Sequence, residues 1–291
     1  MHTFAYQKNQ RYFAQIADGL EDLGKEELAR LGATDVKPSY RGIYFSAAPA
    51  ALYRVNYSAR LISRVMAPLL TFDCHSDRYL YKTARSLPWT DLLTLKTTFA
   101  VFTNVANSNI RHSQYASQKL KDAIVDQFRD ACGDRPQVEP LSPDVWINLY
   151  IHNNKATISL ETSGGSLHRR GYRQESVEAP MQETVAAAVI QLSGWDGERP
   201  LYDPMCGSGT LLTEALMRAC RIPSGYLRAR FGFERLPDFD AAVWGKVKQE
   251  CDKQIRPLPA GLIGGSDVSR AAVEVAQKNC RMLPGGGQIT I

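Results

Sequence analysis

Several features are scarce or missing in this sequence, and each absence excludes a class of protein. The six cysteines stand apart, and even the closest pair, Cys206 and Cys220, is separated by fourteen positions, so no zinc-ribbon or CxxC spacing exists. Scattered single thiols are typical of a reduced intracellular protein. No apolar run approaches the roughly 20 residues of a membrane helix, and the first residues lack the layout of a signal peptide. We therefore expect a cytoplasmic protein with no metal site and no membrane partner.

The net charge of the chain is also small. The 291 residues include 35 Lys and Arg against 30 Asp and Glu, a net charge of +5. This excess permits a polyanionic partner without requiring one. Hydrophobic residues make up 44% of the chain, which is enough for a buried core and excludes global disorder.

Two small α+β units are expected in the first part of the chain. The first unit alternates strands and helices in the order typical of a ferredoxin-like sandwich, at about residues 12–16, 20–31, 42–46, 50–59 and 65–72. The second unit has a strand, a long amphipathic helix and a hairpin, at residues 99–103, 112–131, 145–151 and 156–161. The small residues SGGS at 163–166 are the best candidate for a domain boundary.

The third region predicts the front half of a doubly wound nucleotide-binding sheet. An almost wholly apolar helix over 183–192, which we expect to be buried, precedes a strand at 200–202. A glycine-rich loop, DPMCGSGT, follows at 203–210 and opens a helix. A second strand over 261–265 ends at Asp267 and leads into another helix, and the final residues, QITI, read as the opening of a third strand.

The glycine loop carries the sharpest chemical signal. Gly207 and Gly209 allow a tight turn and close approach of a ligand, and the following helix directs its free N–H groups toward it. The loop lacks the third glycine of the dinucleotide fingerprint and the Gly-Lys-Ser/Thr ending of a phosphate-binding loop. A nicotinamide dehydrogenase is therefore a distant alternative.

Two acids favour a ligand that carries an ammonium group and no phosphate. Asp203 ends the first strand, where a carboxylate would repel phosphates but suit the ammonium of S-adenosylmethionine (SAM). Asp267 ends the second strand, where it can accept both ribose hydroxyls. Taken singly, Asp203 could be a strand-end cap and Asp267 the N-cap of the helix at 269, but their order around one glycine loop favours a cofactor site.

The sequence resembles a bacterial family, the THUMP-domain ribosomal RNA guanine-N2 methyltransferases. The resemblance is collinear over nearly the whole chain and is carried by GLEDLGKEELARLGA, RHSQYASQKLKDAIVDQFR, PDVWINLYIH, SLHRRGYR, APMQETVAAAVI, DPMCGSGT and GGSDVSRAAVEVAQKNC. The long insertion over 222–258 also resembles one in this family. The resemblance implies a ferredoxin-like domain (1–70), a THUMP RNA-binding domain (71–165, with its signature over about 51–163) and an incomplete Rossmann-like class I methyltransferase domain (166–291).

The resemblance also implies the cofactor residues. Asp267 would bind the SAM ribose, while Glu183 and Thr184 would lie near its methionine end, although each could simply begin a buried helix. The SAM loop would comprise Asp203, Pro204, Cys206, Gly207, Ser208, Gly209 and Thr210. No covalent nucleophile is implied, so Cys206 is expected to be only a small loop residue.

One family feature is missing. These enzymes carry an Asn-Pro-Pro-Tyr type motif that accepts hydrogen bonds from the target amine and stacks on the flipped base, and this sequence contains no such tetrapeptide. We therefore expect an N-terminal portion of a longer enzyme, inactive alone. The alternatives are a non-catalytic RNA-binding fragment and an amino-methyltransferase acting on DNA adenine.

Basic residues suggest where large-subunit ribosomal RNA would bind. One group surrounds the start of the long helix, and the other, which includes His168, is interleaved with an aromatic ring; such mixtures suit phosphate contact and base stacking. A solvated face and an interdomain hinge explain them equally well. The candidates are Arg111, His112, Lys119 and Lys121 in the first group and Arg169, Arg170, Tyr172 and Arg173 in the second. Nothing in the sequence indicates an oligomeric state.

Overall fold

A mixed sheet of seven strands runs through the part of the chain before the glycine loop, in the order β2-β3-β1-β4-β7-β6-β5. The computed structural model describes residues 2–291. All neighbouring strands are antiparallel except β5 and β6, which are parallel. The strands are β1 (Arg11–Gln15), β2 (Thr34–Ser39), β3 (Gly42–Ser46), β4 (Arg64–Asp73), β5 (Phe99–Ala106), β6 (Val145–His152) and β7 (Lys155–Glu161).

The long strand β4 joins the two units that the sequence predicts. Its first residues, Arg64–Met66, pair with β1, and the stretch from Met66 to Asp73 pairs with β7. The ferredoxin-like and THUMP units therefore share one sheet, and the expected boundary at residue 70 falls inside a strand. The helices of this part are α1 (Ala5–Asn9), α2 (Glu21–Arg30), α3 (Pro49–Ser58), α4 (Asp77–Arg85) and α5 (Ser113–Cys132), with a 3₁₀ turn, η1 (Trp89–Asp91).

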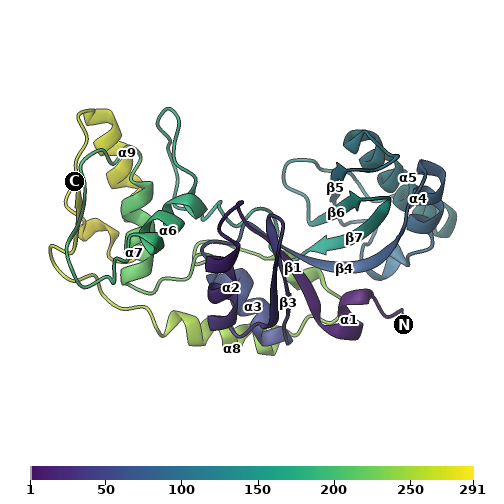
Figure 1. The fold of residues 1–291 in the computed structure, drawn as a ribbon, viewed down its shortest axis with the longest axis horizontal. Helices are drawn as coiled ribbons and strands as arrows, with labels where there is room; N and C mark the ends of the chain where they lie inside the picture. Colours follow the sequence, from purple (N-terminus) through teal and green to yellow (C-terminus); the bar gives the residue numbers. More distant parts are fainter. Residues whose placement is uncertain (1) are drawn as a thin grey trace.

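The third region lies at the opposite end of the molecule from α4 and α5 (Figure 1). Its two strands, β8 (Leu201–Asp203) and β9 (Ile263–Gly265), are parallel, as expected. Where the sequence predicts the opening of a third strand at QITI, Gln288 ends a 3₁₀ turn and Thr290 forms a single parallel bridge with Gly264 of β9. The flanking helices are α6 (Glu183–Leu192), α7 (Thr210–Ala219) and α9 (Arg270–Arg281), with a 3₁₀ turn, η3 (Gly286–Gln288).

The insertion between α7 and β9 returns to the ferredoxin-like unit. It contains η2 (Gly232–Arg235) and α8 (Ala241–Asp252), and α8 lies beside α3 (Figure 1). The ring of Trp244 is 5.3 Å from that of Tyr57 and 5.1 Å from that of Phe233. The Tyr57 hydroxyl donates to Asp252 at 2.6 Å. Because aromatic side chains bury large areas, this contact ties the methyltransferase-like region to the first unit.

The SGGS segment is a tightly held junction. Ser163 Oγ accepts a hydrogen bond from the backbone of Val65 at 2.9 Å. The Arg228 guanidinium donates to the carbonyl oxygens of Ser163, Gly164 and Gly165 at 2.9–3.2 Å. The small residues here permit close packing of three chain segments.

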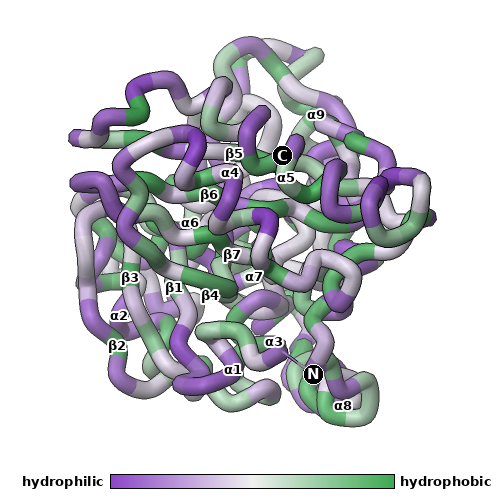
Figure 2. The backbone as a smooth tube through the Cα atoms, turned by 90° about the vertical axis from the view of Figure 1, so that its right-hand side faces the viewer, coloured by the Kyte–Doolittle hydropathy of each residue, from purple (hydrophilic) through white to green (hydrophobic). Residues whose placement is uncertain are grey.

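The structure corrects several sequence expectations. The sequence missed β2, a mostly exposed edge strand whose Pro38 is tolerated because an edge leaves N–H positions unpaired. Helix α6 is not wholly buried, since Val185, Val189 and Leu192 are exposed. Apolar residues otherwise concentrate on the inner strands, and hydrophilic ones dominate the outer loops (Figure 2). No helix within residues 2–291 is long and apolar enough to span a membrane.

A substitution at Gly232 tests how closely the insertion packs on the sheet. A Cβ at this position would lie 2.2 Å from the carbonyl oxygen of Glu161 and 2.9 Å from the amide nitrogen of Gly164. We expect Gly232→Ala to lower the free energy of unfolding by about 1–3 kcal/mol, measured by urea denaturation, because backbone must move to admit the methyl group.

Gly245 in α8 provides the matched control, since nothing lies within 4 Å of its Cβ position. Gly245→Ala should leave stability unchanged or raise it by about 0.5–1 kcal/mol, as expected inside a helix. Equal unfolding midpoints for the two variants would contradict the packing described for Gly232.

Candidate functional site

The glycine loop follows strand β8 and lies at the carboxyl edge of the two parallel strands, β8 and β9. The loop begins after Asp203, the last residue of β8, and ends at Thr210, the first residue of α7. Gly207 and Gly209 have φ angles of +53° and +76°, which favour glycine. A Cβ on Gly209 would lie 3.1 Å from the Cβ of Ala276, so this glycine also lets α7 approach α9.

The loop is joined to the end of β9 by backbone hydrogen bonds. Ser266 donates to the carbonyl oxygen of Asp203, and Cys206 donates to that of Ser266, both at 2.9 Å. The Gly207 amide donates to Asp267 Oδ2 at 2.9 Å. The two strand-end acids therefore lie at one edge of the sheet, as the sequence predicts, and the second acid shapes the loop that follows the first.

Both acids accept backbone hydrogen bonds and keep further acceptor capacity. Asp203 Oδ1 accepts from Met205 at 3.0 Å, and Asp267 Oδ1 accepts from Ser269 at 2.9 Å. The Ser269 and Gly207 amides lower the pKa of the Asp267 carboxyl, so it is ionised at neutral pH. The N-cap of α9 is Ser269, which excludes the simple capping role for Asp267.

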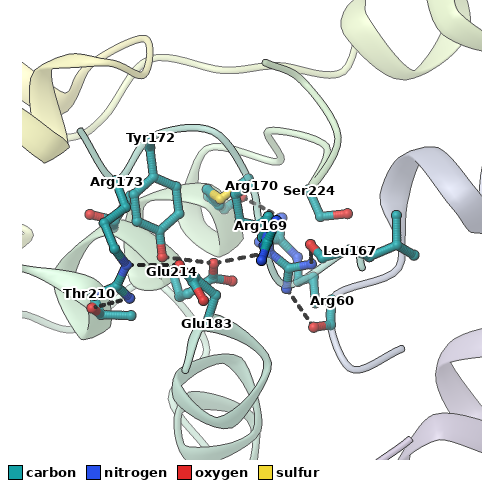
Figure 3. Close-up of polar contacts among 12 residues, drawn as sticks. Arg60, Leu167, Arg169, Arg170, Tyr172, Arg173, Glu183, Thr210, Glu214 and Ser224 are labelled. Atoms are coloured by element: carbon teal, nitrogen blue, oxygen red, sulfur yellow. Dashed lines mark hydrogen bonds and ion pairs between the residues drawn. The ribbon is translucent and has the colours of Figure 1, made fainter. Parts of the chain in front are cut away.

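Arg173 holds the hydroxyl groups of the loop. Its guanidinium donates to Ser208 Oγ at 3.2 Å. It also donates to Thr210 Oγ1 at 3.0 Å and pairs with Glu183 at 3.0 Å (Figure 3). Glu183 is buried in the first turn of α6 beside the equally buried Thr184. In this structure Glu183 orients Arg173. Arg173 is thus bound to the glycine loop and to Glu183 and does not stand free on a surface, in contrast to its prediction as an RNA contact.

Two other RNA candidates are buried and do not reach solvent. Arg170 and Tyr172 are each 1% exposed, and both donate to Oε1 of Glu214 on α7 at 3.2 Å (Figure 3). Arg170 also donates to the carbonyl oxygens of Leu167 and Arg60. Burial and the Glu214 charge raise the pKa of Tyr172 well above its ordinary value. Arg170 and Tyr172 are structural here, while Arg169 is exposed.

The candidates around the start of α5 are all at least partly exposed. Arg111 and His112 are exposed and line a shallow hollow at the start of the helix. The Lys119 ammonium lies 5.2 Å from the centre of the Tyr115 ring. Lys121 pairs with Asp122 at 2.9 Å. Arg111 and His112 remain the most accessible of this group.

Sequence reasoning missed Asn279, which secures the loop from α9. Its side chain is 1% exposed and donates to the Ser208 carbonyl at 3.0 Å. Its Oδ1 accepts from Gln174 at 2.9 Å and Glu175 at 3.3 Å. The sequence shows only an amide side chain on the inner face of a predicted helix, and this does not predict which groups it would hydrogen-bond.

The arrangement fits SAM in its chemistry. It offers one carboxylate for an ammonium group, a second for ribose hydroxyls, and a loop that turns at two glycines. Burial, with the charges of Asp203 and Asp267, raises the pKa of Cys206 to about 11, so its thiol stays protonated and is a poor nucleophile. Among residues 2–291, no group of three or more His, Cys, Asp or Glu side chains could hold a metal ion.

Comparison with protein families divides the chain into three parts. Residues 11–66 match the RlmL ferredoxin-like domain, residues 75–161 the THUMP domain, and residues 170–291 the RMKL-like methyltransferase domain.

Curated relatives extend over nearly the whole chain. The Synechocystis protein named "Putative RNA methyltransferase slr0064" is 38% identical over 278 residues, covering 96% of this chain and 72% of that protein. The ribosomal RNA large subunit methyltransferase K/L of Vibrio campbellii is 39% identical over 275 residues, covering 93% of this chain but 39% of the enzyme. The chain therefore spans less than half the length of the Vibrio enzyme.

Solved structures share the fold. SMU.472, described as "a putative methyltransferase complexed with SAH" (S-adenosylhomocysteine), is 28% identical with a TM-score of 0.82. A Listeria monocytogenes protein, described as a predicted N6-adenine-specific DNA methylase, is 30% identical with a TM-score of 0.83. Each comparison covers 97% of this chain and 74% of the other.

Fold and site together define a methyltransferase domain carried on ferredoxin-like and THUMP domains, as expected from the sequence. The chain belongs to the THUMP-domain methyltransferase family that includes the ribosomal RNA large subunit methyltransferases K/L. SAM is the cofactor of this class.

Substitution of the adjacent arginines separates their roles. Arg170→Ala leaves the Glu214 carboxylate buried without its guanidinium, so we expect a loss of about 3–5 kcal/mol in the free energy of unfolding. The exposed neighbour is the control, and Arg169→Ala should change this free energy by less than about 0.5 kcal/mol. Chemical denaturation checks both values, and similar stabilities would contradict the structural role of Arg170.

Proposed function

We propose that this chain provides the RNA-binding and cofactor-binding parts of a SAM-dependent RNA methyltransferase that acts on guanine N2 in large-subunit ribosomal RNA. One observation supports the cofactor assignment: Asp203 and Asp267 lie at the carboxyl ends of adjacent parallel strands, and the glycine loop that follows Asp203 donates its Gly207 amide to Asp267. SAM supplies the electrophilic methyl group of such a reaction. The contribution of the protein is positioning.

Each residue at the loop has a distinct proposed role. Asp203 would accept the ammonium group, and Asp267, held ionised by two backbone amides, would accept the ribose hydroxyls. Gly207 would allow close approach. Arg173 would act as a positioning residue, because it holds the Ser208 and Thr210 hydroxyls in place. Pro204 and Thr184 would complete the walls.

The RNA assignment is supported by the THUMP match and by the names of the relatives. Guanine N2 is a poor nucleophile, since its lone pair is delocalised into the ring, and it needs acceptor groups that localise that pair. The 291 residues contain no Asn-Pro-Pro-Tyr type motif to supply them. We therefore expect this chain to bind cofactor and RNA but not to transfer a methyl group by itself.

A second candidate is methylation of DNA adenine. It is favoured by one observation, the description of the Listeria structure as a predicted N6-adenine-specific DNA methylase. The same kind of acceptor motif suits both exocyclic amines. The THUMP domain favours RNA over DNA as the substrate class.

Calorimetric titration with SAH tests the cofactor site. Asp267→Asn replaces one acceptor oxygen by an amide NH₂, which faces a backbone N–H or a ribose hydroxyl less favourably. We expect SAH affinity to fall by at least about tenfold, the effect of roughly 1.4 kcal/mol.

Asp196→Asn is the matched control. Asp196 also accepts two backbone N–H groups, from Glu198 and Arg199, but in a turn outside the glycine loop. Its substitution should leave SAH affinity unchanged. Failure of the unsubstituted chain and of the full-length gene product to bind SAH would contradict the proposed function.

Methyl transfer from radiolabelled SAM tests the substrate. With the full-length gene product we expect label in large-subunit ribosomal RNA, recovered after digestion as N2-methylguanosine, and none in duplex DNA. The 291-residue chain assayed beside it should transfer none. Label recovered as N6-methyladenine from DNA would support the second candidate instead.

A further inference from the structure

A cavity of about 580 Å³ lies away from the glycine loop, where all three parts of the chain meet. Its walls come from β6 with the turn before it, from the SGGS junction with His168 and Arg169, and from the insertion between residues 228 and 239. This volume falls within the range of about 300–1,000 Å³ that is usual for ligand sites. Of the residues that line it, the sequence marks only His168 and Arg169, as part of a basic run.

The cavity is strongly basic. Two carboxylates, Asp144 and Glu234, face a larger set of cations: Arg64, His168, Arg169, Arg228, Arg230 and Arg235. With histidine neutral, the five arginines exceed these two carboxylates by three charges, and the buried Glu161, which pairs with Arg64 at 3.9 Å behind the wall, reduces the excess to two. Such a concave basic surface concentrates anions.

Two of these arginines are available to a ligand. The side chains of Arg230 and Arg235 are 56% and 48% exposed, and both pair with the same carboxylate, Asp144, at 2.8 and 3.3 Å. Exposed pairs of this kind contribute little stability. One carboxylate cannot satisfy all the donors of two guanidinium groups, so a phosphate could take up the remainder.

Arg228 has a different role in the same wall. It donates to five backbone carbonyl groups, those of Ser163, Gly164, Gly165, Ser166 and Arg169. These contacts fix the shape of the cavity and bring the Arg169 backbone to its rim. The wall of the cavity is therefore held in a defined shape by hydrogen bonds.

An aromatic platform lies beside the charges. Trp146 on β6 is half-buried and packs edge-on against Phe102, with 6.0 Å between the ring centres. The Arg64 guanidinium lies 4.8 Å from the centre of Phe102 and 5.5 Å from that of Trp146. Stacked aromatic and guanidinium groups are what proteins use to bind unstacked bases.

We infer that this cavity binds a single-stranded segment of the RNA substrate, with phosphates on Arg230, Arg235 and Arg169 and a base against Trp146. The inference rests on the proposed function, because the RNA is that of the methyltransferase. A single strand is favoured over a duplex, since bases in a helix are stacked and cannot enter a cavity to reach a ring. An acidic peptide would use the arginines but not the aromatic platform.

The position suits such a role. Only three residues separate Arg169 at the cavity from Arg173, which holds the cofactor loop, and the buried Arg170 and Tyr172 fix the path between them. An RNA strand held in the cavity would thus be bound to the same segment that orders the SAM loop.

Fluorescence anisotropy with labelled RNA tests the inference on the full chain. The probe is a single strand of about ten nucleotides, within the usual site size, and a hairpin of the same composition provides the duplex. For the double variant Arg230→Ala/Arg235→Ala we expect single-strand affinity to fall at least about tenfold. The slope of log K against log salt should fall by about 1.4, the value for two lost phosphate contacts.

Trp146 is tested independently of charge. Trp146→Leu should weaken single-strand binding at least about fivefold without changing the salt slope, whereas Trp146→Phe, which keeps a stacking ring, should restore most of the affinity. Arg129→Ala is the control for charge. Arg129 is 56% exposed, like Arg230, and pairs with Asp126 at 3.4 Å, but it lies on α5. The affinity of the Arg129→Ala variant for the single strand should lie within about twofold of that of the unsubstituted chain.

The outcomes separate this inference from the proposed function. Single-strand binding by the arginine double variant with unchanged affinity and slope would overturn the cavity assignment, even while SAH binding and methyl transfer persist. A second result would overturn it in favour of a duplex-binding groove: the hairpin binds as tightly as the single strand, the arginine double variant loses this binding, and the Trp146 variants keep it. Absence of SAH binding by the unsubstituted protein would instead contradict the proposed methyltransferase function.

Discussion

The Arg170 guanidinium is the interaction on which the arrangement of the three domains depends. It is 1% exposed and joins the carbonyl oxygen of Arg60 in the ferredoxin-like unit to Glu214 on α7 of the methyltransferase domain. A charge buried this deeply is tolerated only when it is paired and fully hydrogen-bonded. The segment around Arg170 is therefore fixed between the two domains, and the residues on either side of Arg170 are positioned with it.

The neighbouring residues use this fixed path in different directions. Arg169 points to the basic cavity, Tyr172 reinforces the contact with Glu214, and Arg173 reaches the hydroxyls of the glycine loop. The aromatic packing of Trp244 on α8 against Tyr57 provides a second connection between the same domains. The glycine loop and the basic cavity are consequently attached to one hydrogen-bonded and packed junction. This arrangement explains why the segment of small residues at 163–166, of which only Ser163 is fully buried, is held by hydrogen bonds.

Much of the fold could be predicted from the sequence, because hydrophobic periodicity marks strands and helices such as β4 and α5, and because glycines and acids at strand ends mark the cofactor loop. The structure agrees with the expected order of strand, loop and helix and with the grouping of Asp203 and Asp267. Arg170, Tyr172 and Arg173 were misassigned, since charge and aromaticity in a sequence do not reveal burial. Glu214, Asn279 and Arg228 could not be found at all, because their partners lie 42 to 105 positions away along the chain. The edge strand β2 was missed because its residues are mostly exposed and carry no alternating pattern.

We propose that the carboxyl edge of β8 and β9 holds a sulfonium nucleoside between two aspartates, on a loop held by Arg173. A crystal structure of the protein with S-adenosylhomocysteine tests it most directly. The account predicts electron density for the amino acid end beside Asp203 and for both ribose hydroxyls within hydrogen-bond distance of Asp267, with Arg173 still bound to Ser208 and Thr210. Density for the nucleoside at any other surface, with these two carboxylates in contact only with solvent, would contradict it.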